Sequence, residues 1–246
     1  MSPAVVHYLP IVTTALAIPF AVAIGRRFAQ HPDRLHLLWW AIGVGAYGAG
    51  TLTESLTALL GWHEPVFRLW YITGALLGGA PLAQGTVYLM LKRRTAHVLT
   101  AALVAVVAVA SVAVWLSPIQ YDLVEAHRLG GRVFEWTWVR RFSPFINLYA
   151  VIFLVGGAIL SAMRYSKHPD TRHRMWGNVW IAAGAILPGI GGAATRFGYT
   201  EVLYVMELLG LLMMWRGYVI SVRPAPSGAS LGSAREHETL GSFAGG

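Results

Sequence analysis

Long apolar runs constrain this chain more than any motif does. Seven segments of about 20 residues are dominated by apolar side chains, at 4–25, 37–60, 67–91, 97–117, 144–164, 176–195 and 201–221. A helix of that length crosses the roughly 30 Å hydrocarbon core of a bilayer. The sequence therefore predicts an all-α membrane protein whose transmembrane domain, residues 1–222, is a bundle of seven transmembrane helices.

The composition agrees with a membrane environment. Hydrophobic residues make up 56% of the 246 residues, charged residues make up 12%, and the mean hydropathy is +0.55. A soluble domain needs more charge to cover its surface. The formal charge of +8 therefore indicates basic loops at a lipid bilayer and not a nucleic-acid partner.

The positions of the basic residues predict the orientation. Arg26 and Arg27 directly follow the first apolar run, and basic clusters recur in every second loop after it. Because basic loops remain in the cytoplasm, we expect a multi-pass protein of the cell (inner) membrane with its N-terminus outside. The tail 223–246 is rich in Pro, Gly, Ala and Ser, which predicts a disordered cytoplasmic segment.

The longest predicted outer loop, 118–143, is aromatic. Phe134, Trp136 and Trp138 alternate with polar residues, and a Gly-Gly pair precedes them. This pattern predicts a hairpin or a short amphipathic cap on the outer surface. Its aromatic rings would lie at headgroup depth or cover the mouths of the helices.

Two of the predicted inner loops resemble each other. RFAQHPDRLH begins at Arg27 and RYSKHPDTRH begins at Arg164, 137 residues later. The same offset relates Glu64 to Glu201. In each loop an aspartate, Asp33 or Asp170, precedes a predicted helix and is a natural N-cap.

The constant offset favours an internal duplication. We expect residues 4–91 to be repeated as residues 144–221, with 97–117 as a linker helix. An odd linker preserves orientation, so this 3+1+3 arrangement is a parallel repeat about the membrane normal.

Few ionisable residues lie within the apolar runs, and such residues are expensive in a membrane. They suggest a polar pocket in the outer half, where Thr51 and its neighbouring hydroxyl side chains could donate hydrogen bonds to a buried carboxylate. Gln84 stands alone in the inner half. The candidate ligand-binding residues are Glu54, Glu207, Arg196, Arg68, Thr51 and His63. The alternative is a structural Glu–Arg pair, or protonated carboxyl groups, that hold the helices together.

Glycine and proline also have predicted roles. Glycines are concentrated in GVGAYGAG, GALLGGAP and GAILPGIGG, a pattern typical of close helix contact. Pro81 and Pro188 are expected to kink their helices by removing a backbone donor.

Several kinds of chemistry are excluded. There is no cysteine, so thiolate metal sites and iron–sulfur clusters are ruled out. No two histidines are placed to share a haem at mid-membrane depth. The motifs HEXXH, GXSXG and the P-loop do not occur. We therefore expect no catalytic residues, metal or cofactor.

The layout resembles the seven-transmembrane N-terminal sensor region of some bacterial histidine kinases and diguanylate cyclases. The resemblance covers most of residues 10–222, although the chain lacks the output domain of that family. It rests on AYGAGTLTES, LWYITG followed by Pro81, YDLVEAHRLGGRVF and LPGIGG. The 3+1+3 arrangement is also similar to sugar transporters of the SWEET and PQ-loop type, but no Pro-Gln pair is present.

These observations favour a receptor-like membrane module. It would bind a small ligand in its outer half and act through a separate signalling protein or a homo-oligomer. The alternatives are a small-solute transporter that uses the same pocket, or a helper subunit of a membrane complex.

Overall fold

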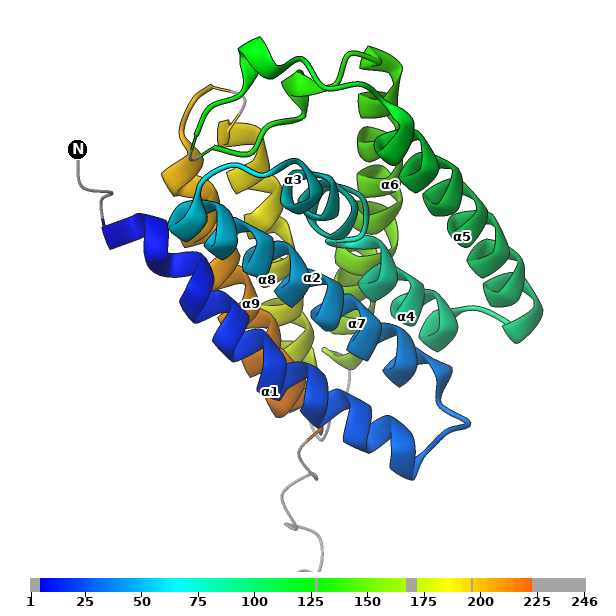
Figure 1. Ribbon diagram of the computed structural model, residues 1–246. Helices are drawn as coiled ribbons and strands as arrows, with labels where there is room; N and C mark the ends of the chain where they lie inside the picture. Colours follow the sequence, from blue (N-terminus) through cyan, green and yellow to red (C-terminus); the bar gives the residue numbers. More distant parts are fainter. Residues whose placement is uncertain (1–4, 127, 167–171, 196, 223–246) are drawn as a thin grey trace, which may run out of the picture.

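A computed structural model describes residues 5–126, 128–166, 172–195 and 197–222. This part of the chain is built of helices and contains no β-strand, which confirms the all-α prediction. Within it, a helix lies at each predicted position. The α-helices are α1 (Leu9–Gln30), α2 (Leu35–Leu60), α3 (Glu64–Trp70), α4 (Ala80–Met90), α5 (Arg93–Leu116), α6 (Phe142–Ala150), α7 (Gly156–Tyr165), α8 (Arg172–Thr195) and α9 (Thr200–Val222) (Figure 1). The predicted disordered tail lies outside the described residues.

Most of these helices suit a membrane. In the described residues, six stretches are long and apolar enough to cross one: Val6–Gln30, Glu64–Met90, Arg93–Leu116, Thr137–Tyr165, Arg172–Thr195 and Thr200–Val222. Two of them contain a π-helical turn. The turn η2 (Tyr71–Leu76) follows α3, and η6 (Val151–Val155) joins α6 to α7.

Helix α2 differs from these six stretches in composition. At 1.5 Å per residue, its 26 residues span about 39 Å, more than the bilayer core. Its buried residues include glycines, hydroxyl side chains and a carboxyl group, among them Gly48, Thr51, Glu54 and Thr57. Lipid would not tolerate such a face. The helix therefore directs this face into the bundle.

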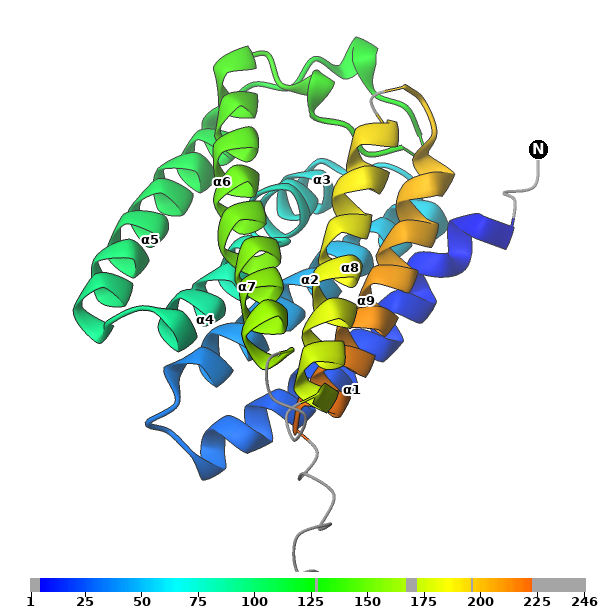
Figure 2. The ribbon, with the colours of Figure 1, turned by 180° about the vertical axis from the view of Figure 1, so that it is seen from behind.

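The hairpins at the two ends of the described chain lie together. Helix α1 packs along α2, α8 packs along α9, and α9 also contacts α1. Helix α4 lies between α2 and the α6–η6 segment, while α5 stands at the edge (Figures 1 and 2). We call the end that holds Gly61, Gly198 and the connection 117–141 the capped end. The opposite end, with His36, Arg93 and Tyr165, is the open end.

Glycines bring α8 and α9 into close contact. Gly177, Gly184 and Gly191 recur every seven residues along α8. A Cβ atom added at Gly184 would lie 2.7 Å from the Gly210 carbonyl oxygen, and one added at Gly177 would lie 2.8 Å from that of Gly217. Small residues allow helix backbones to approach closely. The prediction that glycine serves helix contact is confirmed for this hairpin.

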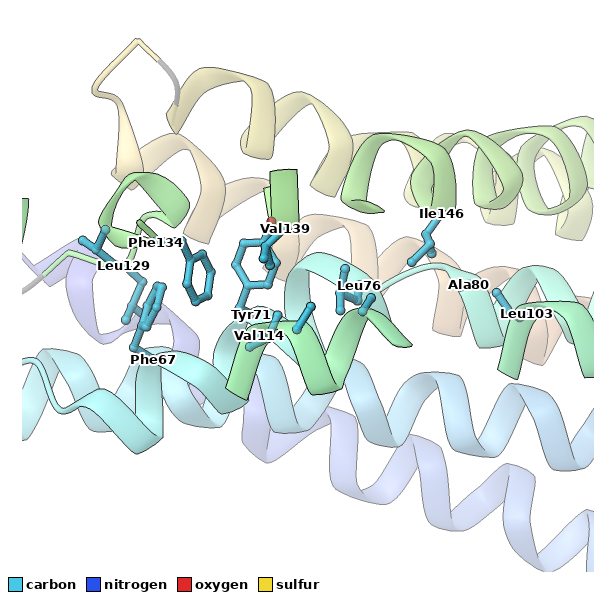
Figure 3. Close-up of a cluster of buried hydrophobic side chains, with 13 residues drawn as sticks. Phe67, Tyr71, Leu76, Ala80, Leu103, Val114, Leu129, Phe134, Val139 and Ile146 are labelled. Carbon is cyan, nitrogen blue, oxygen red and sulfur yellow. The ribbon is translucent and has the colours of Figure 1, made fainter. Parts of the chain in front are cut away.

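Aromatic side chains fill the capped end. Phe67 of α3, Tyr71 of η2 and Phe134 of the connection are all buried. The Phe134 ring centroid lies 4.9 Å from the centroid of each of the other two rings. Leu129 and Val139 of the same connection pack into this cluster (Figure 3). The connection is therefore part of the core at this end.

The connection is folded differently from the predicted hairpin. It contains short 3-10 turns at Tyr121–Leu123, Gly131–Val133 and Thr137–Arg141, and the isolated bridges there do not form a strand. Phe134 covers the helix mouths, whereas Trp138 is 46% exposed. The alternation predicted one shared face. Trp136 and Trp138 do stack on each other, with ring centroids 5.8 Å apart, whereas Phe134 is buried in the aromatic cluster.

The stretch Glu64–Met90 is discontinuous. After η2 the helix is interrupted at 77–79, and α4 begins at Ala80 with Pro81 in its first turn. The prediction that Pro81 kinks a continuous helix is wrong. Proline is tolerated in a first turn, where its missing N–H is not needed. Pro188 lies inside α8.

The turn before α2 corrects another prediction. The Arg34 amide donates to the His31 carbonyl (3.0 Å), and Arg34 occupies the N-cap position without a side-chain cap. The prediction that Asp33 caps this helix is wrong, because the turn places Asp33 one residue too early. Its carbonyl accepts a hydrogen bond from Arg93 (2.9 Å). Asp170, the second predicted cap, lies outside the described residues.

Candidate functional site

Two acidic side chains meet inside the bundle. Glu54 of α2 is 3% exposed, and its carboxyl group lies beside that of Glu207 on α9. The Oε2 atom of each residue is buried and accepts no hydrogen bond from an N–H or hydroxyl group of the described residues. Ionised carboxylates only accept hydrogen bonds, so contact between two of them requires a proton on one. Two carboxyl groups this close therefore need at least one proton to stay side by side.

Neutral groups surround this carboxyl pair. Trp70 Nε1 donates to Glu54 Oε1 (2.9 Å), and the Tyr47 hydroxyl donates to the Glu207 backbone carbonyl (2.8 Å). Among the described residues, no cation forms an ion pair with either carboxyl group. Arg196, the predicted cation, lies outside those residues. Hydrogen bonds to neutral donors hold the pair in place.

The hydroxyl groups near Glu54 serve the backbone of α2. Thr53, Ser55 and Thr57 donate to carbonyls one turn earlier, at 2.6–2.9 Å. Thr51 does the same (3.1 Å) and also contacts the Thr14 hydroxyl of α1 (2.8 Å). The prediction that they donate to Glu54 is wrong. In a helix, a Ser or Thr hydroxyl readily reaches the carbonyl one turn back.

Arg68 forms its hydrogen bonds at the capped end. Its guanidinium donates to Glu64 Oε1 (2.7 and 2.9 Å), to the Ser117 carbonyl (2.9 Å) and to the Val114 carbonyl. The last carbonyls of α5, which lack partners within the helix, are thereby satisfied. The Tyr121 hydroxyl donates to the other Glu64 oxygen, and this hydrogen bond to a carboxylate raises the pKa of Tyr121.

His63 is also apart from the carboxyl pair. It is exposed, and its Nδ1 lies 3.2 Å from the Gly61 carbonyl oxygen. Of the candidate residues, the structure thus brings Glu54 and Glu207 into contact, with Thr51 one turn away on α2. It separates Arg68 and His63 from them. Whether these residues bind a ligand stays a prediction.

Gln84 belongs to a polar network and is not alone as predicted. Its side-chain nitrogen donates to the Thr100 hydroxyl (2.7 Å), and its oxygen accepts from the Tyr149 hydroxyl (2.5 Å). Thr100 in turn donates to Tyr88, whose hydroxyl lies 2.8 Å from His97 Nδ1. Apart from the capped end, this network is the main polar link between α5 and its neighbours α4 and α6.

A cavity of about 300 Å³ occupies the open half of the bundle. Helices α1, α2, α4, α7, α8 and α9 contribute to its wall, together with η6. Its apolar lining includes Phe20, Val44, Leu82, Leu154, Ile181 and Met214, and its polar lining includes His36, Ser161, Arg174, Asn178 and Ser221. The sequence predicted a polar pocket in the outer half of the bundle and gave no sign of this cavity in the open half.

The carboxyl pair lies beyond the deep end of this cavity. Met214 follows Glu207 by seven residues on α9, a rise of about 10 Å. Tyr47 and Leu211, which are 7% and 0% exposed, lie between these two levels along α2 and α9. They and their neighbours form an apolar layer between the cavity and the pair.

Comparisons with known proteins give no family for this chain. No protein-family model matches it, and neither does any curated protein or solved structure. Within the described residues, no three His, Cys, Asp or Glu side chains are grouped as metal ligands. The carboxyl pair and the cavity are therefore the features of this chain that bear on its function.

Simple spacing could have found two missed partners of the carboxyl pair. Tyr47 precedes Glu54 by seven residues, so the two share a face of α2. Glu54 lies before the turn at Gly61, and Trp70 lies about equally far after it. In an antiparallel helical hairpin this places Glu54 and Trp70 at similar depth. The cavity had no comparable signal, because its lining comes from many helices.

Proposed function

We propose that this protein is a membrane carrier for a small solute, and that protonation of the Glu54–Glu207 pair is coupled to solute movement. The contact between the two carboxyl groups carries the proposal. Polar and ionisable groups inside a membrane are costly and mark proton relays or ion pathways. A pair that must hold a proton to stay together would separate, or exchange partners, when that proton leaves.

Two further features support a carrier. The stretch Glu64–Met90 is interrupted at 77–79. Gly74, just before this interruption, lies in close contact with Gly50 of α2. Discontinuous helices line the central sites of many secondary transporters. The cavity reaches one end of the bundle while aromatic side chains close the other. A carrier that faces one side of the membrane has this arrangement.

The proposal includes the predicted topology. We propose that α2 crosses the membrane as a seventh span, because it lies antiparallel to α1 in the same bundle. The capped end then faces outside, and the open end, with its basic residues, faces the cytoplasm. A reporter fused after Val222 tests this. Activity of a periplasm-dependent reporter there would overturn the orientation.

We also propose the 3+1+3 repeat as the basis of the carrier. It is supported by Gly61 and Gly198, the two described residues with positive φ (83° and 99°), which follow α2 and α8 and are 137 residues apart. Superposition of α1–α4 on α6–α9 in an experimental structure tests it. Unrelated helix packing in the two halves would contradict it.

Proteoliposomes with a pH-sensitive dye inside test the coupling. The solutes are a hexose, hexyltrimethylammonium and hexanesulfonate, none of which carries a proton across lipid by itself. We expect at least one to drive proton movement with the native chain. Glu54→Gln should abolish it, whereas Glu201→Gln, on the exposed first turn of α9, should not. Equal proton movement in E54Q and the native protein would contradict the proposal.

A receptor-like module is the second candidate. The observation that favours it is the capped end, where the connection seals the outward path that a carrier needs. Such a receptor would bind its ligand in the bundle and act through a separate signalling protein. Saturable ligand binding without solute-driven proton movement in the same proteoliposomes would support it.

A further inference from the structure

The cavity in the open half has a polar rim and an apolar interior. We propose that it binds a small amphiphilic anion, with a carboxylate, sulfonate or phosphate head and an apolar body. This inference rests on the proposed function only in that it names the solute class of the carrier. Its direct evidence is the lining of the cavity.

Arg174 is the expected partner of the anionic head. Its guanidinium lies 5.9 Å from the ring centroid of Tyr165, where both side chains border the cavity. In the part of the chain that the structure describes, Arg174 has no ion-pair partner. Among the described residues, no Asp or Glu lines the cavity. The positive charge at the rim is therefore available to a ligand, and an anion is the ligand that it favours.

Further donors lie around the same rim. Ser161 borders the cavity from α7, so its hydroxyl can donate to a ligand oxygen. His36 packs its ring edge-on against Trp40 (5.1 Å), which fixes its orientation at the cavity wall. Together these side chains offer hydrogen bonds to an oxyanion beside Arg174.

The interior of the cavity selects the body of the ligand. Leu82, Leu154 and Met214 present apolar surface, while Gly157 and Ala158 leave space along α7. A volume of about 300 Å³ lies at the lower end of the range for small-molecule sites. A short chain or a single ring fits this space, whereas the two acyl chains of a phospholipid do not. A lipid headgroup could still supply the anion at the rim.

Hexanesulfonate is the probe for the first experiment. The native protein in phosphatidylcholine nanodiscs is titrated, and binding is followed by calorimetry, with hexanol and hexyltrimethylammonium as probes of the same length. We expect hexanesulfonate to bind at least about tenfold more tightly than either, as one charge-assisted contact allows. Equal affinity of the three probes would overturn the proposal.

Matched variants test the assigned rim and interior. Arg174→Gln should weaken hexanesulfonate binding by about tenfold or more, whereas Arg172→Gln, exposed and outside the cavity, should not. Ser161→Phe should fill the cavity and abolish binding, whereas Ser166→Phe, beyond the end of α7, should leave it intact. Unchanged binding in both R174Q and S161F would overturn the site even if the native protein binds the probe.

The lipid composition of the nanodisc identifies the source of the anion. If phosphatidylglycerol competes with hexanesulfonate, the site takes an anionic lipid headgroup; if it does not, the site takes a soluble molecule. Both results support the anion site.

The experiments distinguish failure of the anion site from failure of the carrier proposal. Specific binding of hexanesulfonate without solute-driven proton movement would contradict only the carrier proposal. Proton movement driven by the hexose or the cation alone would contradict only the anion site.

Discussion

The capped end and the open end of this bundle are built in opposite ways. At the capped end, Phe134 and its neighbours fill the space between the helices, and Arg68 satisfies Glu64 together with two carbonyls of α5. At the open end, a cavity of about 300 Å³ remains between the helices. One end of the bundle is therefore closely packed, and the other keeps unfilled space.

The same contrast separates two uses of polar groups in a membrane protein. Arg68 is held by several hydrogen bonds, which makes it a structural residue. The Glu54–Glu207 pair needs at least one proton to keep its carboxyl groups side by side, so its stability should change with the protonation state. Substitutions at the capped end should therefore affect folding most, and substitutions at the open end should affect binding most.

The largest expected effect is that of Phe134→Ala. It removes a fully buried ring from a segment outside the membrane spans, where the hydrophobic effect acts in full. The free energy of unfolding should fall by about 3–5 kcal/mol. Denaturant unfolding in detergent measures it, with Trp138→Ala at an exposed position as the control. Equal losses in the two variants would show that the capped end is not a packed core.

Arg68→Met should have the second-largest effect. The methionine retains much of the side-chain volume but leaves Glu64 and the carbonyls of Val114 and Ser117 without their donor. We expect a loss of about 2–3 kcal/mol in the same unfolding assay. Arg132→Met, at an exposed site in the connection, is the control. A loss within error of this control would contradict the structural role of Arg68.

Leu89→Ala should have a small effect on stability. Leu89 lines the cavity but is 53% exposed, so its truncation creates little new empty volume. The expected loss is about 0.5 kcal/mol. The same change at Leu76, which is 0% exposed in the capped core, should cost about 2–5 kcal/mol. Similar losses at both positions would remove the contrast between the two ends.

Tyr121→Phe should have the smallest effect, and that effect should depend on pH. The hydrogen bond to Glu64 raises the folded-state pKa of Tyr121 above its ordinary value of about 10. Its stabilising contribution is therefore complete below pH 10 and is lost as pH rises through the folded-state pKa. Melting temperatures of the native protein and Y121F should differ at pH 8 and converge above pH 10. A constant difference would mean that the hydroxyl acts in some other way.

Much of the fold was predictable because membrane helices are specified locally. Apolar runs predicted where helices lie, and the glycines of GAILPGIGG predicted close helix contact, which Gly184 of α8 makes with α9. Local rules also led to mistakes. Asp33 has the residue type of an N-cap but not the position, and the hydroxyl groups near Glu54 bond to their own helix. In both cases, backbone geometry a few residues away decided the outcome.

By itself, the sequence determined that this chain is an all-α protein with apolar helices of membrane length, and that Glu54 and Glu207 are its exceptional residues. The apolar content and the rarity of charge within the helices suffice for both conclusions. Only the tertiary structure decided that the two carboxyl groups lie side by side, that Trp70 donates to Glu54 and that the cavity lies in the open half. These features depend on how helices distant in the sequence pack against one another, and helix periodicity does not encode which helices become neighbours.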